Sequence, residues 1–215
     1  MRCELSVYLV TDAAVSATAG HDVAAIAAAA TRGGVSCVQV REKQAPAREF
    51  LATVQRVCEA VPPHVAVLVN DRIDVYLAAR ANGAPVAGVH VGQSDLPART
   101  VRALIGPDAV LGVSASTPDQ LARAADDGAD YVGIGALHAT ATKRDAPAPL
   151  GHEAFARLVR ASALPAVAIG GVTAADAPAL RAAGAAGAAV VSAVCGAPDP
   201  ERAARALRVA WEAAL

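Results

Sequence analysis

Aromatic side chains are scarce in this sequence. One Trp, three Tyr and two Phe make up 3% of its 215 residues, while hydrophobic residues reach 54%. Alanine and valine must therefore supply much of the core, and such small side chains suit close packing of helices on a sheet. A single domain of this length buries about 70% of its extended-chain surface. We therefore expect one domain that spans residues 1–215.

Long apolar runs and an excess of one charge are also missing. No run approaches the roughly 20 apolar residues of a membrane-spanning helix, and residues 1–4 lead directly into a strand-like segment without the pattern of a signal peptide. The net charge of -1 gives no reason to expect nucleic acid as a partner. We expect a cytoplasmic protein with neither a membrane nor a nucleic-acid partner, and the sequence leaves a homo-oligomer open.

The spacing of the cysteines excludes two further classes of site. The four cysteines stand at positions 3, 37, 58 and 195, without a Cys-x-x-Cys pair and without the spacing of a zinc site. We interpret them as reduced thiols that fill small spaces in the core.

One pattern repeats along the chain: a short apolar segment, typical of a strand, precedes a segment with helical periodicity. Continuous apolar runs are typical of parallel strands covered on both faces. Eight such units predict an α/β protein with a single (β/α)8 TIM barrel, whereas an open doubly wound sheet is the alternative. The predicted strands cover 6–11, 36–41, 65–69, 86–91, 110–114, 130–135, 166–170 and 188–192. The predicted helices cover 21–32, 45–60, 72–82, 174–183 and 199–214, and three more begin near 97, 117 and 151.

Polar residues follow most of these strands. In a TIM barrel the active site lies where the strands end and the following loops begin. Gln39, Arg41 and Lys43 alternate along an extended segment, so their side chains point the same way. A diphosphate between the two cations would relieve their repulsion. The alternative is a solvated pair whose charge is balanced by Glu42.

Two carboxylates end neighbouring strands. Asp71 follows Asn70 after the third strand, and Asp95 follows the fourth. Two carboxylates near a diphosphate predict an Mg2+ site, because Mg2+ takes oxygen ligands and is often shared with substrate phosphates. The alternative role for Asp71 and Asp95 is capping of the helices that follow.

A second phosphate site is expected at the end of the last two strands. Gly170-Gly171 and Val191-Ser192 stand where barrels of this type often bind phosphate through backbone N–H groups. The connection of residues 138–149 is long and carries threonines and cations, so it is either a lid over phosphorylated substrates or a plain loop. These residues together predict two phosphorylated substrates, or one large one, and a diphosphate leaving group.

The histidines receive no catalytic role. We assign neither His90 nor His138 as a general base, because a histidine in an apolar strand more often has a structural role. His21, His64 and His152 belong to no visible group of functional residues.

Eight segments in order, from about Tyr8 to Val194, together resemble the thiamine-phosphate synthase family. They are YLVTD, VQVREK, VNDRIDVYLA, GVHVGQSDLP, GVSAST, YVGIGALHATATKRDA, AIGGV and AAVVSAV. The resemblance implies a transferase that joins a pyrimidine diphosphate to a thiazole phosphate through a pyrimidine carbocation, with Mg2+ as cofactor and pyrophosphate as product.

The resemblance also assigns roles to residues of this chain. Gln39 would contact the pyrimidine, and Asp71 and Asp95 would bind Mg2+. Among the residues of the diphosphate site, Arg41, Ser114 and Lys143 are assigned as catalytic. The diphosphate would be held by Arg41, Lys43, Asn70, Ser114 and Lys143. The thiazole phosphate would be held by Thr140, Thr142, Gly171, Val191 and Ser192.

Three departures from the family pattern stand out. Residues 136–140 read Ala-Leu-His-Ala-Thr where relatives commonly have prolines and an aromatic residue, Ser94 stands where many have an acidic residue, and residues 81–85 look like a short insertion. Two other functions remain as alternatives. One is a thiazole tautomerase of the same superfamily, which needs neither metal nor diphosphate, and the other is a barrel that binds phosphorylated ligands without catalysis.

Overall fold

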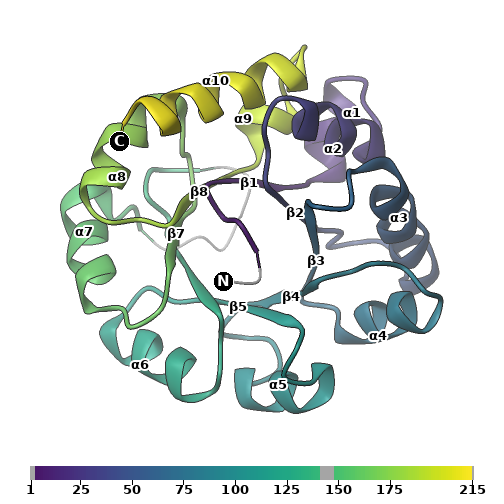
Figure 1. Cartoon of the computed structure of the whole chain (residues 1–215), viewed down its shortest axis with the longest axis horizontal. Coiled ribbons are helices and arrows are strands. Elements are labelled where there is room, and N and C mark those ends of the chain that lie inside the picture. The colour runs from purple at the N-terminus through teal and green to yellow at the C-terminus, as the bar shows by residue number, and fades with distance from the viewer. Residues whose placement is uncertain (1–2, 141–147, 215) are drawn as a thin grey trace.

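Eight parallel strands form a closed barrel in the computed structural model, which describes residues 3–140 and 148–214. Each strand pairs with the next one along the chain, and β8 pairs with β1 to close the ring (Figure 1). The closed sheet confirms the (β/α)8 prediction and excludes the open sheet. The strands are β1 (Val7–Val10), β2 (Cys37–Val40), β3 (Ala66–Asn70), β4 (Gly88–Val91), β5 (Val110–Ser114), β6 (Tyr131–Ile134), β7 (Ala166–Ala168) and β8 (Gly187–Val190).

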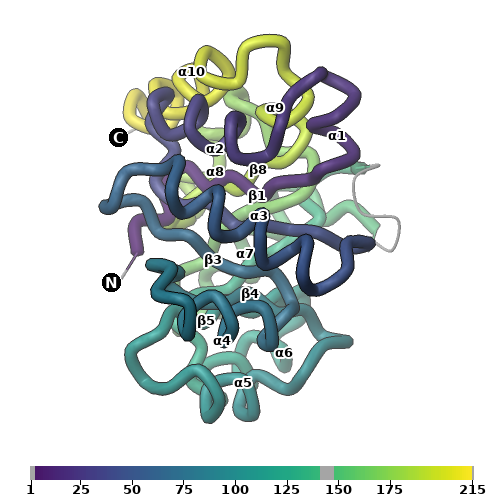
Figure 2. Tube along the Cα trace, turned by 90° about the vertical axis from the view of Figure 1, so that its right-hand side faces the viewer, coloured from purple at the N-terminus to yellow at the C-terminus, as the bar shows by residue number. Residues whose placement is uncertain are grey.

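Helices surround the ring of strands (Figure 1). In the side view, α10 lies at one end of the molecule and α5 at the other, with strands between them (Figure 2). The last helix, α10, packs against α2 and so completes the outer ring (Figure 1). The helices are α1 (Ala13–Thr18), α2 (Val23–Arg32), α3 (Ala47–Ala60), α4 (Ile73–Ala81), α5 (Ala98–Ile105), α6 (Pro118–Asp126), α7 (Gly151–Ala161), the 3-10 turn η1 (Ala174–Asp176), α8 (Ala177–Ala182), α9 (Ser192–Cys195) and α10 (Pro200–Ala213).

The predicted elements agree with the observed ones to within a few residues, apart from two short helices. Helices α1 and α9 were not predicted, because they fill the loops after β1 and β8 and are too short to show a periodic pattern. The start of α6 is as expected. Thr117 Oγ1 accepts a hydrogen bond from Gln120 N at 3.3 Å, and Pro118 occupies the first turn.

The apolar side chains form two clusters, one on each side of the barrel wall. The larger cluster lies between the strands and the helices, and the smaller one fills the barrel interior. Because side chains alternate along a strand, the same strands contribute to both. The interior is apolar around Leu68, Val110 and Val167, but buried polar residues follow toward the carboxyl ends of the strands. Those polar residues include Gln39, Asn70 and His90.

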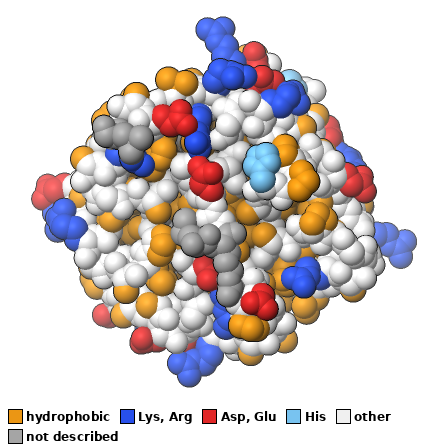
Figure 3. All heavy atoms as spheres, in the orientation of Figure 1, with side chains coloured by type: hydrophobic (Ala, Val, Ile, Leu, Met, Phe, Trp, Pro, Cys, Tyr) orange, Lys and Arg blue, Asp and Glu red, His pale blue; other side chains and the backbone are white. Residues whose placement is uncertain are grey.

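The surface carries both signs of charge. On the face that Figure 3 shows, basic and acidic side chains are interspersed around the edge and do not gather by sign. Among the described residues, no helix combines the length and the apolar character needed to cross a membrane.

Candidate active site

A cavity of about 450 Å3 lies at the carboxyl ends of the strands, where the sequence predicted the site. Side chains from every strand or the loop after it line this pocket. The structure therefore brings the predicted residues together, apart from two that lie outside the described part of the chain, Thr142 and Lys143. The predicted residues that line the pocket are Gln39, Arg41, Lys43, Asn70, Asp71, Asp95, Ser114, Thr140, Gly171, Val191 and Ser192.

Two cations line the pocket among the described residues, Arg41 and Lys43, and both are paired with carboxylates. Arg41 Nη1 donates to Asp12 Oδ2 at 2.7 Å, and the Lys43 ammonium donates to Asp71 Oδ2 at 2.5 Å. Arg41 and Lys43 are therefore paired with Asp12 and Asp71, whereas the alternative prediction had Glu42 balance their charge. The Arg41 side chain is only 15% exposed, so Asp12 holds the guanidinium in position at the edge of the pocket.

Asp71 and Asp95 lie together, as expected for ligands of one cation. The backbone of Asp71 is in the left-handed region, with φ 59°, and its N–H donates to His90 O at 2.8 Å. Asp95 Oδ2 accepts from Gly92 N at 2.7 Å. Burial and the neighbouring Asp71 carboxylate raise the pKa of Asp95. The negative charges of two neighbouring carboxylates repel each other, and a divalent cation bound between them would offset this repulsion.

The alternative role for these carboxylates, helix capping, is wrong. The residue at the N-cap position of α4 is Arg72, and that of α5 is Pro97; neither helix has a side-chain cap. Asp95 stabilises the turn that begins at Gly92 and leaves the start of α5 uncapped.

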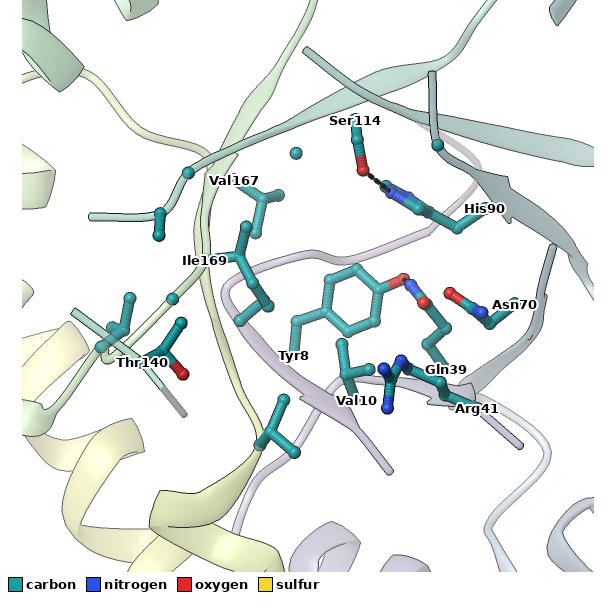
Figure 4. A pocket seen from close by; sticks show the side chains of 18 of the residues that line it. Tyr8, Val10, Gln39, Arg41, Asn70, His90, Ser114, Thr140, Val167 and Ile169 are labelled. Carbon is teal, nitrogen blue, oxygen red and sulfur yellow. Dashed lines mark hydrogen bonds between the residues drawn. The ribbon is translucent and has the colours of Figure 1, made fainter. Parts of the chain in front are cut away.

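A chain of buried hydrogen bonds crosses the floor of the pocket. Ser114 Oγ lies 3.0 Å from His90 Nε2, and His90 Nδ1 lies 2.8 Å from the Tyr131 hydroxyl. The Tyr131 hydroxyl is 2.7 Å from that of Tyr8. The Tyr8 hydroxyl also accepts from Gln39 Nε2 at 2.6 Å, and these two side chains meet in Figure 4. We call these five residues the relay. It gives His90 the structural role that the sequence suggested, and it connects the predicted pyrimidine contact to the predicted diphosphate contact.

Gly112 makes room for the relay. A Cβ at this position would overlap both the ring of Tyr131 and Nδ1 of His90. A glycine in β5 is therefore required by the close approach of two side chains from β4 and β6.

The opposite side of the pocket has the features of a phosphate site. Gly170 and Gly171 have φ values of 95° and 66°, and Ser192 is the first residue of α9. A Cβ on Gly171 would lie 2.9 Å from that of His138, so the two loops pack tightly here. Thr140 lies on this side, across Val167 and Ile169 from the polar group of Arg41 and Asn70 (Figure 4).

One group of neighbouring titratable side chains was missed. His138 and His152 both donate to Asp176 Oδ1, at 2.7 and 2.9 Å. The prediction that His152 belongs to no such group is therefore wrong. Burial alone would raise the pKa of Asp176, but the hydrogen bonds from His138 and Thr173 lower it overall. No local pattern relates these residues, because they come from three separate segments.

The comparison with known proteins decides the family. The family model described as thiamine monophosphate synthase matches residues 7–194. The chain belongs to this family. It is 45% identical to the thiamine-phosphate synthase of Roseiflexus sp. (strain RS-1) over 97% of the chain and 86% of that protein. With the thiamine-phosphate synthase of Corynebacterium efficiens it shares 48% identity, over 85% of each chain.

A solved structure of a family member has the same architecture. The thiamine phosphate pyrophosphorylase from Pyrococcus furiosus superposes with a TM-score of 0.86 at 30% identity, covering 100% of this chain and 98% of the other. The family members are synthases, so the chain is an enzyme of the transferase class. Neither the tautomerase nor the non-catalytic barrel is favoured by these relatives.

Proposed function

We propose that the enzyme joins 4-amino-2-methyl-5-hydroxymethylpyrimidine diphosphate to 4-methyl-5-(2-phosphoethyl)thiazole, with release of pyrophosphate. The observation that carries this proposal is the division of the pocket. One side gathers cations and polar groups, the other gathers glycines and hydroxyl groups, and an apolar wall lies between them (Figure 4). Two phosphorylated heterocycles, each held at its own end, fit such a pocket.

On the first side, Arg41 and Lys43 would bind the diphosphate oxygens, with Asn70 and Ser114 as neutral donors. Arg41 is held by Asp12 through one nitrogen, which leaves other guanidinium N–H groups for the diphosphate. Gln39 would contact the pyrimidine from its place in the relay. Lys143 would complete the diphosphate contacts, although it lies outside the described residues.

The cofactor in this proposal is Mg2+, held by Asp71 and Asp95. The fit rests on the two adjacent carboxylates that line the pocket, one of them already in contact with the Lys43 ammonium. Mg2+ bound there would supply positive charge for the departing diphosphate.

On the second side, the thiazole phosphate would be bound by Thr140, Gly171, Val191 and Ser192. Glycine at position 171 lets the backbone approach an anion closely. Thr142, outside the described residues, belongs to the same set.

In the proposed reaction the pyrimidine methylene carbon loses its bond to the diphosphate oxygen and gains one to the thiazole nitrogen. The bonding pair leaves with pyrophosphate, so positive charge develops on the methylene carbon as the bond breaks. Arg41 and Ser114 stabilise the departing diphosphate, and their contribution is greatest where the charge is greatest. The apolar wall around Val167 and Ile169 keeps water from competing with the thiazole.

The test is a coupling assay with the purified protein, both heterocycles and Mg2+. We expect one pyrophosphate released per thiamine phosphate formed, and no product without a divalent cation. Interconversion of thiazole tautomers without metal, in the absence of coupling, would instead show the tautomerase activity. Binding of both ligands without any product would show the non-catalytic barrel.

A further inference from the structure

Three side chains outside the pocket converge on one point of the rim. His138 follows β6, His152 lies in the first turn of α7, and Asp176 is the last residue of η1. One ligand atom from each of the three lies within 4.8 Å of the other two. None of the three residues lines the pocket. We call this group the His–Asp–His cluster.

Main-chain hydrogen bonds fix the segments that carry the cluster. Leu150 N donates to Ala136 O at 2.9 Å, and Gly151 N donates to Leu137 O at 3.0 Å. These two bonds place residue 152 beside residue 138. His138 N then donates to Gly170 O at 2.9 Å, which ties the same segment to the loop that leads to η1. The framework of the barrel therefore holds the histidines side by side, with ring centroids 5.2 Å apart.

Asp176 is oriented toward the two histidines. The residue is only 6% exposed. Its Oδ2 accepts from Thr173 N at 2.8 Å and from Thr173 Oγ1 at 2.9 Å, so Oδ1 is turned toward His138 and His152. Carboxylates that bind metal ions are commonly held in place in this way, by hydrogen bonds to the oxygen that does not face the ion.

We propose that the His–Asp–His cluster binds one divalent transition-metal ion, Zn2+ foremost, at a site separate from Asp71 and Asp95. Two imidazoles and one carboxylate are a donor set for Zn2+ and Co2+, whereas Mg2+ takes mainly oxygen ligands. The histidine side chains are 39% and 43% exposed, so the outer side is open to the ion and to the water that completes its coordination.

Binding requires a small rearrangement. In a tetrahedral zinc site with bonds of about 2.0 Å, ligand atoms lie roughly 3.3 Å apart. The present distances of 2.7 and 2.9 Å to Asp176 Oδ1 must therefore widen by about half an ångström. Each imidazole must also carry its proton on Nδ1 so that Nε2 can bind the ion. The bound ion would join the loop after β6, α7 and η1, and would stabilise the folded chain over the unfolded one.

The experiment titrates the full metal-free chain with Zn2+ by calorimetry and with Co2+ by visible absorption. We expect one ion per chain and a cobalt spectrum without a thiolate band, because the four cysteines are buried and none belongs to the cluster. His138→Gln and His152→Gln should each weaken binding at least about tenfold, since each removes one of the three ligands. His64→Gln, which changes an exposed histidine elsewhere, should leave binding unchanged.

Two further variants keep the test independent of folding and of the coupling reaction. Thr173→Ala retains all three ligands and the backbone hydrogen bond to Asp176 but removes the hydroxyl one, and it should weaken Zn2+ binding by about tenfold. The double variant Asp71→Asn/Asp95→Asn should bind Zn2+ as tightly as the wild type. Zn2+ should raise the melting temperature of the wild type and of His64→Gln, but not that of His152→Gln. Absence of Zn2+ and Co2+ binding, or binding that survives both histidine variants, would show that the cluster is held by hydrogen bonds alone.

Discussion

At the scale of single residues, the relay shows how a mostly apolar barrel interior can hold polar groups. Burial raises the pKa values of Tyr8 and Tyr131 well above their ordinary value, so both remain neutral phenols that donate and accept. Each of the three inner members, His90, Tyr131 and Tyr8, has a partner on either side, which removes the cost of an unsatisfied buried group. The relay therefore positions Gln39 and Ser114, and both ends of it line the pocket.

Tyr131→Phe tests whether the relay positions these two residues. Loss of the Tyr131 hydroxyl removes one hydrogen bond from the Tyr8 hydroxyl and one from His90 Nδ1, so we expect the free energy of unfolding to fall by about 1–3 kcal/mol. The loosened contacts should lower kcat/KM by roughly tenfold or more. Steady-state kinetics and urea unfolding measure both effects.

Tyr76→Phe is the matched control for this variant. Tyr76 is equally buried, but it lies on α4 and its hydroxyl accepts from Arg80 outside the pocket. Its removal should change stability and leave kcat/KM near the wild-type value. An unaltered kcat/KM in Tyr131→Phe would show that the relay serves stability alone.

The carboxylate pair carries a second prediction at this scale. Asp71→Asn and Asp95→Asn should each lower kcat by roughly a hundredfold or more, as expected for loss of one preorganised electrostatic contact worth about 3 kcal/mol. Because both residues would act through one ion, the double variant should lose far less than the sum of the single losses. The fold should survive, since both side chains line the open pocket. Additive losses measured by steady-state kinetics would instead assign the two residues to separate sites.

At the scale of elements, close packing between neighbouring strands decides where side chains can go. Position 112 of β5 is a glycine, and the absence of a side chain there leaves room for His90 of β4 and Tyr131 of β6 to contact each other. The glycine of one strand is thus part of the site that its neighbours form.

Gly112→Ala should therefore damage the site from within the barrel wall. The new methyl group must displace the Tyr131 ring or the His90 ring, and overpacking of this kind costs typically about 1–3 kcal/mol. We expect both a lower melting temperature and a lower kcat/KM. Gly83→Ala offers a control, because its φ of 80° strains an alanine but no atom lies within 4 Å of the new Cβ. It should lower stability with normal kcat/KM.

At the scale of the whole molecule, the first and last segments of the barrel are joined by charge as well as by packing. Arg208 on α10 donates to Glu4 Oε1 at 2.8 Å and to Ser6 Oγ at 2.9 Å. The hydrogen bonds from Arg208 and Ser6 lower the pKa of Glu4. A carboxyl with a lowered pKa in the folded state contributes stability above its ordinary pKa, and this contribution is lost as the pH falls through the lowered value.

Glu4→Gln should show this pH dependence. The Glu4 side chain is 60% exposed, so the loss of unfolding free energy at pH 7 should stay below about 1 kcal/mol. The difference from wild type should shrink as the pH falls and vanish once Glu4 is protonated in both states. Urea unfolding at neutral and acidic pH measures this difference in unfolding free energy. Glu59→Gln, at the exposed end of α3, is the control. A difference that persists in acid would show that the carboxylate's charge is not the cause.

Much of the fold was predictable from the sequence because it is encoded locally. Each strand is a short continuous apolar run that precedes a helical pattern, and a parallel sheet with both faces covered requires such runs. The polar residues that end these runs predicted the rim, since the carboxyl ends of parallel strands meet at one end of a barrel. Gln39, Asn70, Asp71 and Asp95 were found in this way, and the pocket contains all of them.

The tertiary structure alone decided which of these groups touch each other. Arg41 takes Asp12 as its partner, and Lys43 takes Asp71, over separations of 29 and 28 residues. The relay joins Tyr8 to Tyr131 across 123 residues, and His138 meets Asp176 across 38. Contacts of this kind leave no periodic trace in the sequence, because they depend on the closure of the barrel and on loop geometry. The sequence determines the ring of eight units and the polar rim, whereas closure of the ring decides which of its side chains meet.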